Sequence, residues 1–224
     1  ISGEVAGAGN LIAFNDQNGV NVVNGATNAI VRNSIHSNVL LGINLGTAGV
    51  TANDSGDGDT GANSLQNFPV LTSAVTTGTQ ITISGTLNST ASTSFRIEFY
   101  SNATGDGTGH GEGQMLIGVT DVTTDGLGNA SFSPTFTATI SAGSAISATV
   151  SRLDTGDAPI ETSEFAQNVV ASLVNDAPVL DDTKSPALTA QNEDSGAPSG
   201  AVGTLVSSLV RSEERRVGKE CRIG

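Results

Sequence analysis

The sequence predicts an all-β protein that contains more than one β module, and three observations favour this class. The composition is rich in Gly, Ser, Thr, Asn and Ala, lacks Trp, and places short runs of Val, Ile and Phe between turn residues. One motif recurs at a fixed spacing near the N-terminus. Farther along, apolar and polar residues alternate with the two-residue period of a half-buried strand. No apolar run is long enough for a membrane-spanning helix.

The N-terminal segment repeats itself with an offset of 23 residues. Two stretches match at this offset: Asn10-Leu-Ile12-Ala-Phe-Asn15 with Asn33-Ser-Ile35-His-Ser-Asn38, and Gly19-Val-Asn-Val22 with Gly42-Ile-Asn-Leu45. A further Asn-x-Ile-x-x-Asn copy begins at Asn28. We expect each repeat to form one turn of a coil, with apolar residues stacked inside and strands of successive turns in parallel. The asparagines then lie at the corners, where stacked amides bond to one another.

This pattern resembles the right-handed parallel β-helix repeat family over roughly residues 1–50, and the last coils are expected to extend over 1–68. The family includes polysaccharide lyases and glycosidases. Arg32 and His36 are the catalytic candidates in this segment. Because no carboxylate cluster accompanies them, as acid–base chemistry on a glycosidic bond requires, we interpret both as outward-pointing corner residues.

An acidic, glycine-rich loop follows the repeats. Asp54, Asp57 and Asp59 lie within six residues. Alternate oxygen ligands on a flexible loop suit a hard cation, so the loop is a candidate calcium site, Ca²⁺ being the one cofactor that the sequence suggests. The spacing is not that of an EF-hand. The alternative is a solvated acidic turn that closes the last coil, before an exit strand near Phe68-Pro-Val-Leu71.

From residue 74 to residue 172 the pattern changes to independent hairpins. The expected strands are Thr79–Leu87, Thr93–Ser101, Met115–Asp121, Asn129–Thr139, Ser144–Leu153 and Ser163–Ser172. In the second of these, Phe95, Ile97 and Phe99 alternate with Arg96, Glu98 and Tyr100, which predicts one buried face and one wet face. A tight turn is expected between Thr124 and Asn129. The segment is predicted to be an immunoglobulin-like β-sandwich.

The same segment resembles a domain that commonly follows such β-helices in large bacterial surface proteins. The matching landmarks, in order, are Ser84-Gly-Thr-Leu-Asn88, Arg96-Ile-Glu-Phe-Tyr100, Gly109-His-Gly-Glu-Gly113, Thr124-Asp-Gly126 and Thr162-Ser-Glu-Phe165. His110 and Glu112 could form a metal or acid–base pair. An exposed glycine-rich hairpin is the preferred interpretation, and no catalytic residue is assigned.

Residues 173–210 begin a third unit. Asn175-Asp176-Ala-Pro178 resembles the joints of cadherin-like tandem repeats, in which calcium stiffens a rod of domains. Pro178 favours an extended entry to the next strand, while Asn175 and Asp176 supply oxygen ligands at the junction. The unit is expected to be the truncated start of such a repeat.

Residues 211–224 differ abruptly from the rest and resemble a translated sequencing adapter, so we exclude them as an artefact. They hold five of the nine basic residues, three acidic residues and the only cysteine, Cys221. The remaining chain therefore has 4 basic against 19 acidic residues. Such a charge argues against nucleic-acid and anionic-membrane partners. Without a native cysteine, a disulfide framework and a thiolate zinc site are excluded.

Two functional hypotheses follow. The first is a fragment of a modular bacterial protein, extracellular or on the cell surface, with a structural or adhesive role, possible partners among surface glycans or proteins, and no enzymatic activity. The alternative is the C-terminal part of a carbohydrate-active β-helix enzyme, a polysaccharide lyase or glycosidase whose active site lies upstream of residue 1. Carbohydrate binding without turnover is disfavoured by the absence of Trp and the single Tyr, because sugars usually rest on aromatic faces.

Overall fold

The computed structural model describes residue 1 and residues 8–174, and this part of the chain is all-β, as predicted. The cadherin-like segment with Asn175 and Asp176, and the tail at 211–224, lie outside the described residues. The N-terminal elements are β1 (Leu11–Ala13), β2 (Val20–Val22), β3 (Ser34–His36), β4 (Ile43–Leu45) and the 3₁₀ helix η1 (Ala62–Leu65). In the described part, no helix is long and apolar enough to cross a bilayer.

The two predicted repeats form two stacked coils. β1 pairs with β3 and β2 with β4, both in parallel. The register places Ile12 beside Ile35 and Val20 beside Ile43, at the 23-residue offset of the sequence repeat. The inward residues of the second coil are closed off from solvent, since Ile35 and Ile43 are only 2% and 1% exposed. The repeat therefore sets the strand register, as expected from the motif.

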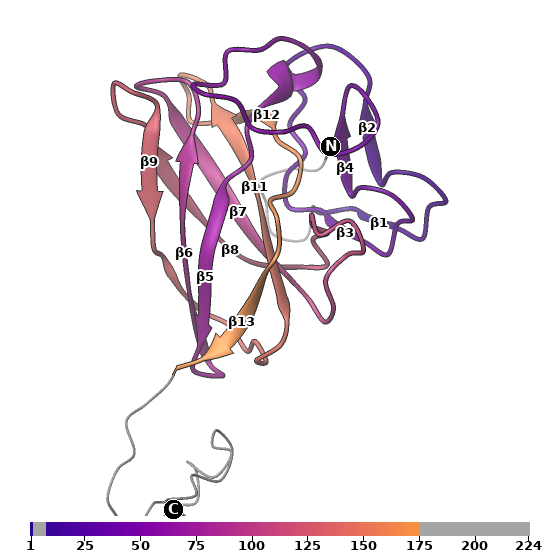
Figure 1. Ribbon diagram of the computed structural model, residues 1–224, viewed down its shortest axis with the longest axis vertical. Coiled ribbons are helices and arrows are strands. Elements are labelled where there is room, and N and C mark those ends of the chain that lie inside the picture. Colours follow the sequence, from indigo (N-terminus) through magenta and orange to yellow (C-terminus); the bar gives the residue numbers. More distant parts are fainter. Residues whose placement is uncertain (2–7, 175–224) are drawn as a thin grey trace, which may run out of the picture. The chain divides into compact units, whose positions relative to one another are not determined.

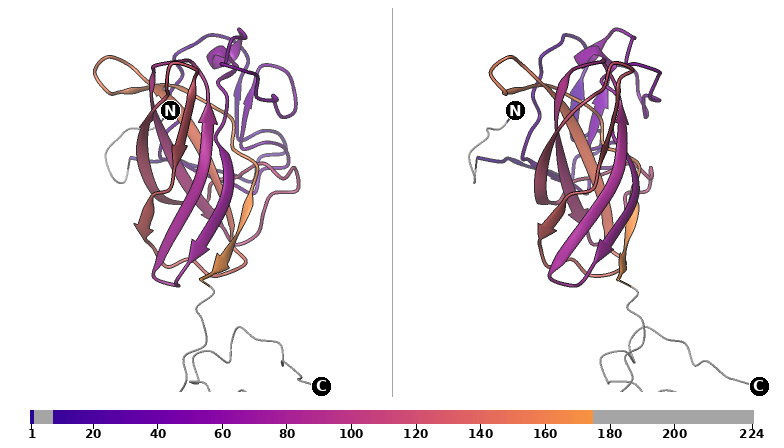
Figure 2. Two further views of the ribbon diagram at one scale, coloured as in Figure 1. Left: turned by 60° about the vertical axis from the view of Figure 1, so that its left-hand side comes forward. Right: turned by 90° about the vertical axis from the view of Figure 1, so that its left-hand side faces the viewer.

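The remaining strands form a β-sandwich of two layers beside the coils (Figures 1 and 2). They are β5 (Val70–Thr76), β6 (Gln80–Asn88), β7 (Ser94–Asn102), β8 (Met115–Thr123), β9 (Asn129–Phe132), β10 (Thr135–Thr137), β11 (Ala145–Leu153), β12 (Pro159–Thr162) and β13 (Val169–Leu173). One layer contains β10, β6 and β5 with β9 alongside β6, and the other contains β11, β7 and β8 with β12 alongside β11. β13 joins the layers, since it pairs with β5 in parallel and with β11 antiparallel.

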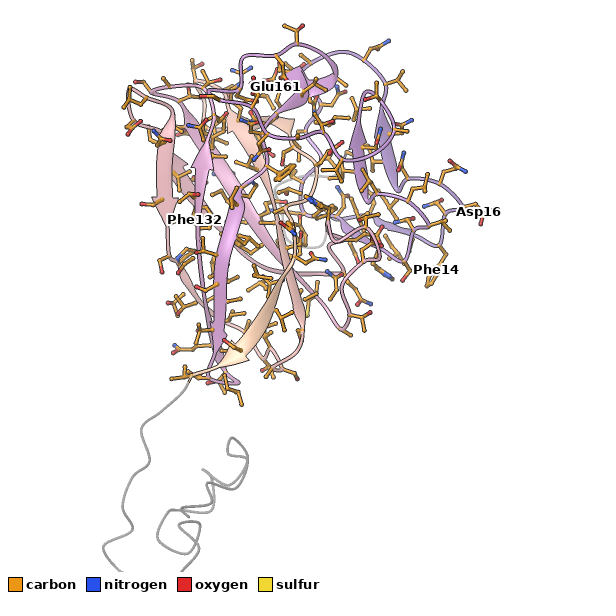
Figure 3. All side chains as sticks on the ribbon, in the orientation of Figure 1. Phe14, Asp16, Phe132 and Glu161 are labelled. Carbon is orange, nitrogen blue, oxygen red and sulfur yellow. The ribbon has the colours of Figure 1, made fainter. Side chains whose placement is uncertain are left out.

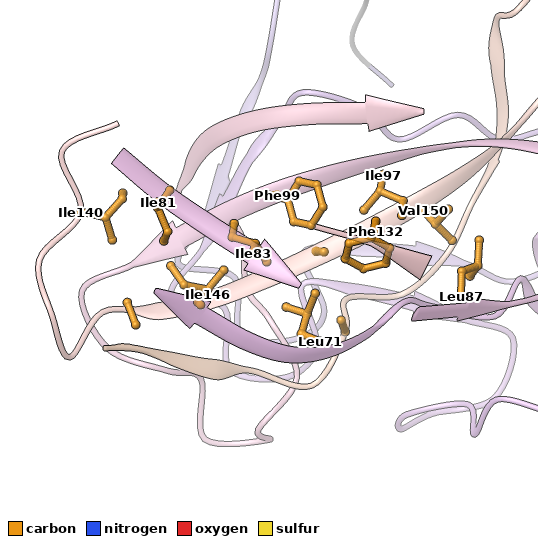
Figure 4. Close-up of a cluster of buried hydrophobic side chains, with 14 of the residues drawn as sticks. Leu71, Ile81, Ile83, Leu87, Ile97, Phe99, Phe132, Ile140, Ile146 and Val150 are labelled. Carbon is orange, nitrogen blue, oxygen red and sulfur yellow. The ribbon is translucent and has the colours of Figure 1, made fainter. Parts of the chain in front are cut away.

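Apolar side chains fill the space between the two layers (Figure 4). Phe99 lies at the centre, with ring centroids 5.6 Å from Phe132 and 5.4 Å from Phe136. Phe95, Ile97 and Phe99 are all fully buried, which confirms the inward face predicted from their alternation. Burial of a large apolar side chain of this kind stabilises the fold by about 1.5–3 kcal/mol.

The prediction that the other face of β7 is wet was wrong. Glu98 is 1% and Tyr100 2% exposed, because the N-terminal coils cover this face of the sheet. The tyrosine ring packs in one apolar cluster with Ile35, Ile43 and Phe165. Tyr100 and Phe165 thus complete the apolar core of the coils, which is separate from the core inside the sandwich. Ile1–Val174 forms one compact unit.

Most predicted strands are present with small shifts, and the exceptions have local causes. The expected strand Asn129–Thr139 is two strands, interrupted at Ser133 and Pro134, because a proline cannot donate to a ladder. The expected strand Ser163–Ser172 is ordered as a strand only from Val169. The strand at Val70 pairs with β6 and so lies within the sandwich. The predicted turn between β8 and β9 is present, with Gly128 at a φ of 83°.

Candidate functional site: the junction of coils and sandwich

Asparagine side chains connect one turn of the coil to the next. Oδ1 of Asn33 accepts hydrogen bonds from the backbone N–H and Nδ2 of Asn10, at 3.1 and 2.9 Å. Oδ1 of Asn38 accepts the same pair of donors from Asn15, at 3.2 and 2.6 Å. One amide oxygen therefore satisfies two donors of the preceding turn, and the predicted corner ladders are confirmed.

The third copy of the motif stacks on a different partner from the other two. Asn28 donates from its backbone N–H and Nδ2 to Oδ1 of Asn63, at 2.9 and 3.0 Å, 35 residues farther along the chain. Asn63 belongs to η1 and is fully buried. The turn after the second coil is thus longer by an insertion that contains the acidic loop.

At the end of the second coil, a carboxylate takes the place of the next asparagine. The Nδ2 of Asn38 donates to Oε1 of Glu112 at 2.6 Å, and its backbone N–H lies 3.1 Å from Oε2. Glu112 lies in the loop between β7 and β8, where its own carbonyl accepts from Nδ2 of Asn102. The neighbouring Gly113 exchanges two backbone hydrogen bonds with Ile35 of β3, at 2.9 and 2.7 Å. This loop therefore pairs with the coil edge as a further strand would.

Glu164 closes the adjacent strand of the second coil. Its Oε1 accepts the backbone N–H of Leu45 and its Oε2 that of Thr51, both at 2.8 Å. The residue follows β12 and is 2% exposed. The carboxylate thereby satisfies the N–H of Leu45, on the side of β4 that faces away from β2, and the N–H of Thr51, which lies outside any strand.

Glu98 makes a third contact of the same kind from the centre of β7. Its Oε2 accepts the backbone N–H of Arg32 at 2.8 Å and the hydroxyl of Tyr100 at 2.6 Å. The guanidinium Nε of Arg32 lies 4.0 Å from Oε1. Oε1 itself is buried and, within the described residues, accepts no hydrogen bond. The carboxylate is therefore held by one side of the coil and by its own strand.

Burial raises the pKa of all three carboxyl groups. For Glu98, Glu112 and Glu164 loss of solvent is the largest effect, and the hydrogen bonds from coil and strand donors partly oppose it. The hydrogen bonds show that each carboxylate binds donors of the protein itself. We name Glu98, Glu112 and Glu164 the closing glutamates.

The two catalytic candidates of the coil segment, Arg32 and His36, have different structural partners. Arg32 adopts a left-handed φ of 55° and packs against Glu98, so it does not point outward as predicted. The ring of His36 meets Phe14 edge-on at 5.7 Å, and its Nδ1 lies 3.0 Å from the hydroxyl of Ser37. Both positions are half-buried by the coil or the sandwich.

The predicted exposed hairpin at 109–113 is also corrected, because it lies against the coil. His110 contacts the carbonyl of Phe165 at 3.1 Å and the ring of Phe68 at 5.2 Å, whereas Glu112 bonds to Asn38. The two residues thus bind different partners. Glu112 is only 3% exposed, which is the reverse of a solvated loop residue.

The acidic loop brings its three predicted carboxylates together. Carboxylate oxygens of Asp54, Asp57 and Asp59 lie within 4.8 Å of one another. Asp57 is the most tightly held, because its Oδ1 accepts the backbone N–H of Asn67 at 2.9 Å and its Oδ2 accepts Nε2 of Gln66 at 2.6 Å. Burial raises its pKa, the hydrogen bonds from the Ser89 hydroxyl and the Asn67 N–H oppose the rise, and the two neighbouring carboxylates add to it.

Asp59 completes the acidic cluster with an unused oxygen. Its Oδ1 is shielded from solvent and accepts no hydrogen bond within the described residues. Burial and the charge of Asp54 raise its pKa. A divalent cation would supply the positive charge that this arrangement lacks, and carboxylate oxygens are its usual ligands. The donor set thus fits the predicted calcium chemistry, while the bonds of Asp57 also give that residue a structural role.

No protein-family model matches this chain, and no curated protein matches it. The distinctive contacts of the chain are those of carboxylates that bind backbone and amide donors where the coil meets the sandwich.

Proposed function

We propose that this chain is a non-enzymatic structural and adhesive segment of a modular secreted or cell-surface protein, in which the sandwich closes one end of a stack of parallel β coils. The observation that supports this most strongly is the use of the closing glutamates. Each is buried and each accepts backbone N–H donors from the second coil. Carboxylates used in this way hold two modules together, and at least one oxygen of each binds the coil.

A closed end meets a physical need of a coil stack. The last turn of a parallel coil presents a row of backbone donors and acceptors, which favour pairing with any strand that approaches. Buried donors that stay unpaired cost about 1–3 kcal/mol each. In this chain the loop residue Gly113 and the closing glutamates satisfy that row. The sandwich therefore acts as a terminator that protects the stack from edge-to-edge association.

The proposal extends to calcium at the acidic loop and to a rod-like role outside the cell. Three carboxylates share a small volume, and burial raises the pKa of Asp57 and of Asp59, with repulsion from Asp54 adding to both rises. A bound cation would relieve that repulsion and fix the loop to the end of β6, where Asn88 already accepts the backbone N–H of Gly56 at 2.8 Å. A stiffened joint suits a segment that extends or displays other modules.

Cooperative unfolding tests the proposed role. In the full chain, amide exchange is measured at Val22 and Ile35 in the coils and at Ile97 and Val150 in the sandwich. A terminator whose Tyr100 and Phe165 complete the core of the coils predicts equal free energies of opening for the four amides. Coil amides that open at a far lower free energy, with the sandwich still folded, would contradict the role. Turnover of a polysaccharide by the chain would contradict its non-enzymatic character.

A further inference from the structure

The two ends of the coil stack differ in how their strand edges are paired. The far edge of β3 is paired with Gly113, and that of β4 is met by Glu164. Among the described residues, by contrast, β1 pairs only with β3 and β2 only with β4. Successive residues of a parallel strand point their N–H and C=O groups to opposite sides, and the groups of Ile12 and Val20 face the second coil. Those of Leu11, Ala13 and Asn21 therefore face the outer edge.

The two corner ladders, Asn10–Asn33 and Asn15–Asn38, share a direction that leaves acceptors at that outer edge. Between β2 and β4 the direction is reversed, because Nδ2 of Asn44 donates to Oδ1 of Asn21. In both corner ladders, Oδ1 of the later residue takes two donors from the residue 23 positions earlier. Asn33 and Asn38 use their Oδ1 atoms in this way. The equivalent atoms of Asn10 and Asn15 accept no hydrogen bond from any described residue. The first coil therefore presents two Oδ1 acceptors at its outer edge, as the second coil presents two Oδ1 acceptors to the first coil.

The side chains of the first coil are also more exposed than the equivalent side chains of the second coil. Asn33 and Asn38 are 3% and 5% exposed, whereas Asn10 and Asn15 are exposed. Two apolar side chains are also uncovered on the first coil, Leu11 at 70% and Phe14 at 77% exposure. Phe14 lies on the side of the coils away from the sandwich (Figure 3). Exposed apolar groups beside an unpaired strand edge are typical of an interface.

We propose that the edge of β1 and β2 binds one further parallel β coil with the same 23-residue pattern. Its asparagines donate from backbone N–H and Nδ2 to Oδ1 of Asn10 and Asn15, and its outward apolar residues cover Leu11 and Phe14. The contact repeats, by translation, the interface between the first and second coils. This inference rests on the proposed function, in which the sandwich closes one end of the stack. The opposite end accepts a coil of defined polarity.

A tandem duplication tests the fit. In the full chain, residues 8–30 are repeated once, which adds a coil and preserves the 23-residue phase. The amides of Leu11 and Ala13 in the inner copy are then expected to exchange at least about 10-fold more slowly than in the unmodified chain, because a parallel strand covers them. The matched control carries the same duplication with Ile12 and Val20 of the outer copy replaced by Asp, and should show no such protection.

Three outcomes would overturn the inference. The first is unchanged exchange at Leu11 and Ala13 in the inner copy. The second is loss of sandwich signals in the duplicated chain when the control keeps them, since the added coil would then be incompatible with the fold. The third is concentration-dependent protection of these amides in the unmodified chain, which would assign the edge to a second copy. The exchange experiment on the unmodified chain tests the closing role separately, so the two proposals can fail independently.

Discussion

Oε1 of Glu112 has the same relationship to Asn38 that Oδ1 of Asn38 has to Asn15. In both cases Nδ2 of the asparagine donates at 2.6 Å, and the backbone N–H of the same residue donates to the same side chain. Glu112 therefore ends a ladder of amides with a carboxylate from a different module.

Asn38 is predicted to tolerate no negative charge. Asn38→Asp keeps the acceptor for Asn15 but replaces a buried donor to Glu112 with a second carboxylate. We expect a loss of about 3 kcal/mol or more in the free energy of unfolding at neutral pH, from the lost bond and the repulsion. Urea titration measures this loss. Asn21→Asp is the matched control, because Asn21 is exposed and, among the described residues, its side chain only accepts, from Nδ2 of Asn44. This variant should change stability by less than about 0.5 kcal/mol.

The closing glutamates predict a pH dependence of stability. Their pKa values are raised above the usual 4.5 by burial, so just above that pH the folded state holds protons that the unfolded state has released. The stabilisation that these three groups give the folded state is greatest near pH 4.5, and it is lost as the pH rises through their raised pKa values. The thermal midpoint should therefore increase as pH falls from about 7 towards about 5.

Glu164→Gln is the variant that assigns this dependence. It removes one of the titrating groups and should reduce the slope of the thermal midpoint against pH. Asp125 and Asp154 have lowered pKa values, so their opposing effect appears only below about 3.8. A thermal midpoint that decreases between about pH 7 and 5, or a slope unchanged in the variant, would contradict the prediction.

The close packing of coil and sandwich predicts a sensitive glycine. A Cβ added at Gly42 would lie 2.8 Å from the ring of Phe165 and 3.1 Å from Cγ of Glu112. Because Phe165 is buried, the ring has little room to move, and Gly42→Ala should destabilise the protein by about 1–3 kcal/mol. Gly107→Ala is the control, since its Cβ would meet no atom within 4 Å. Equal midpoints of chemical unfolding for the two variants would show that the junction is loosely packed.

Calcium is predicted to raise the thermal midpoint through the acidic loop. Calcium at millimolar concentration should stabilise the chain by mass action, whereas magnesium, which prefers a more regular octahedral shell, should have a smaller effect. Replacing Asp54 and Asp59 by Asn should remove the calcium effect and leave the bonds of Asp57 to Asn67 and Gln66 in place. If the midpoint is insensitive to calcium, or equally sensitive in the variant, the loop is a solvated turn that Asp57 anchors.

The sequence predicted the repeat far better than the contacts between modules. Ile12 and Ile35 share a periodic pattern, and periodicity reports strand register directly. Glu98 alternates with apolar neighbours, so it was assigned to a wet face, and nothing local indicates that a coil 66 residues earlier covers it. Glu164 appeared only as part of a landmark motif. The one available signal was a glutamate at an otherwise strand-like position. Such a carboxylate is either exposed to solvent or buried with a hydrogen-bond partner, and only the tertiary structure shows which of the two applies.

The pair Glu112→Gln and Glu112→Ala tests the central claim, that a carboxylate replaces the next rung of the asparagine ladder. A glutamine keeps an Oε1 that can accept from Nδ2 and the backbone N–H of Asn38, as an amide oxygen does for Asn15. We predict that the glutamine variant unfolds within about 1 kcal/mol of the parent, while the alanine variant loses about 2–4 kcal/mol and exposes the Asn38 amide to exchange. If both variants lose the same stability, or if alanine is tolerated, the sandwich does not close the coil stack in this way.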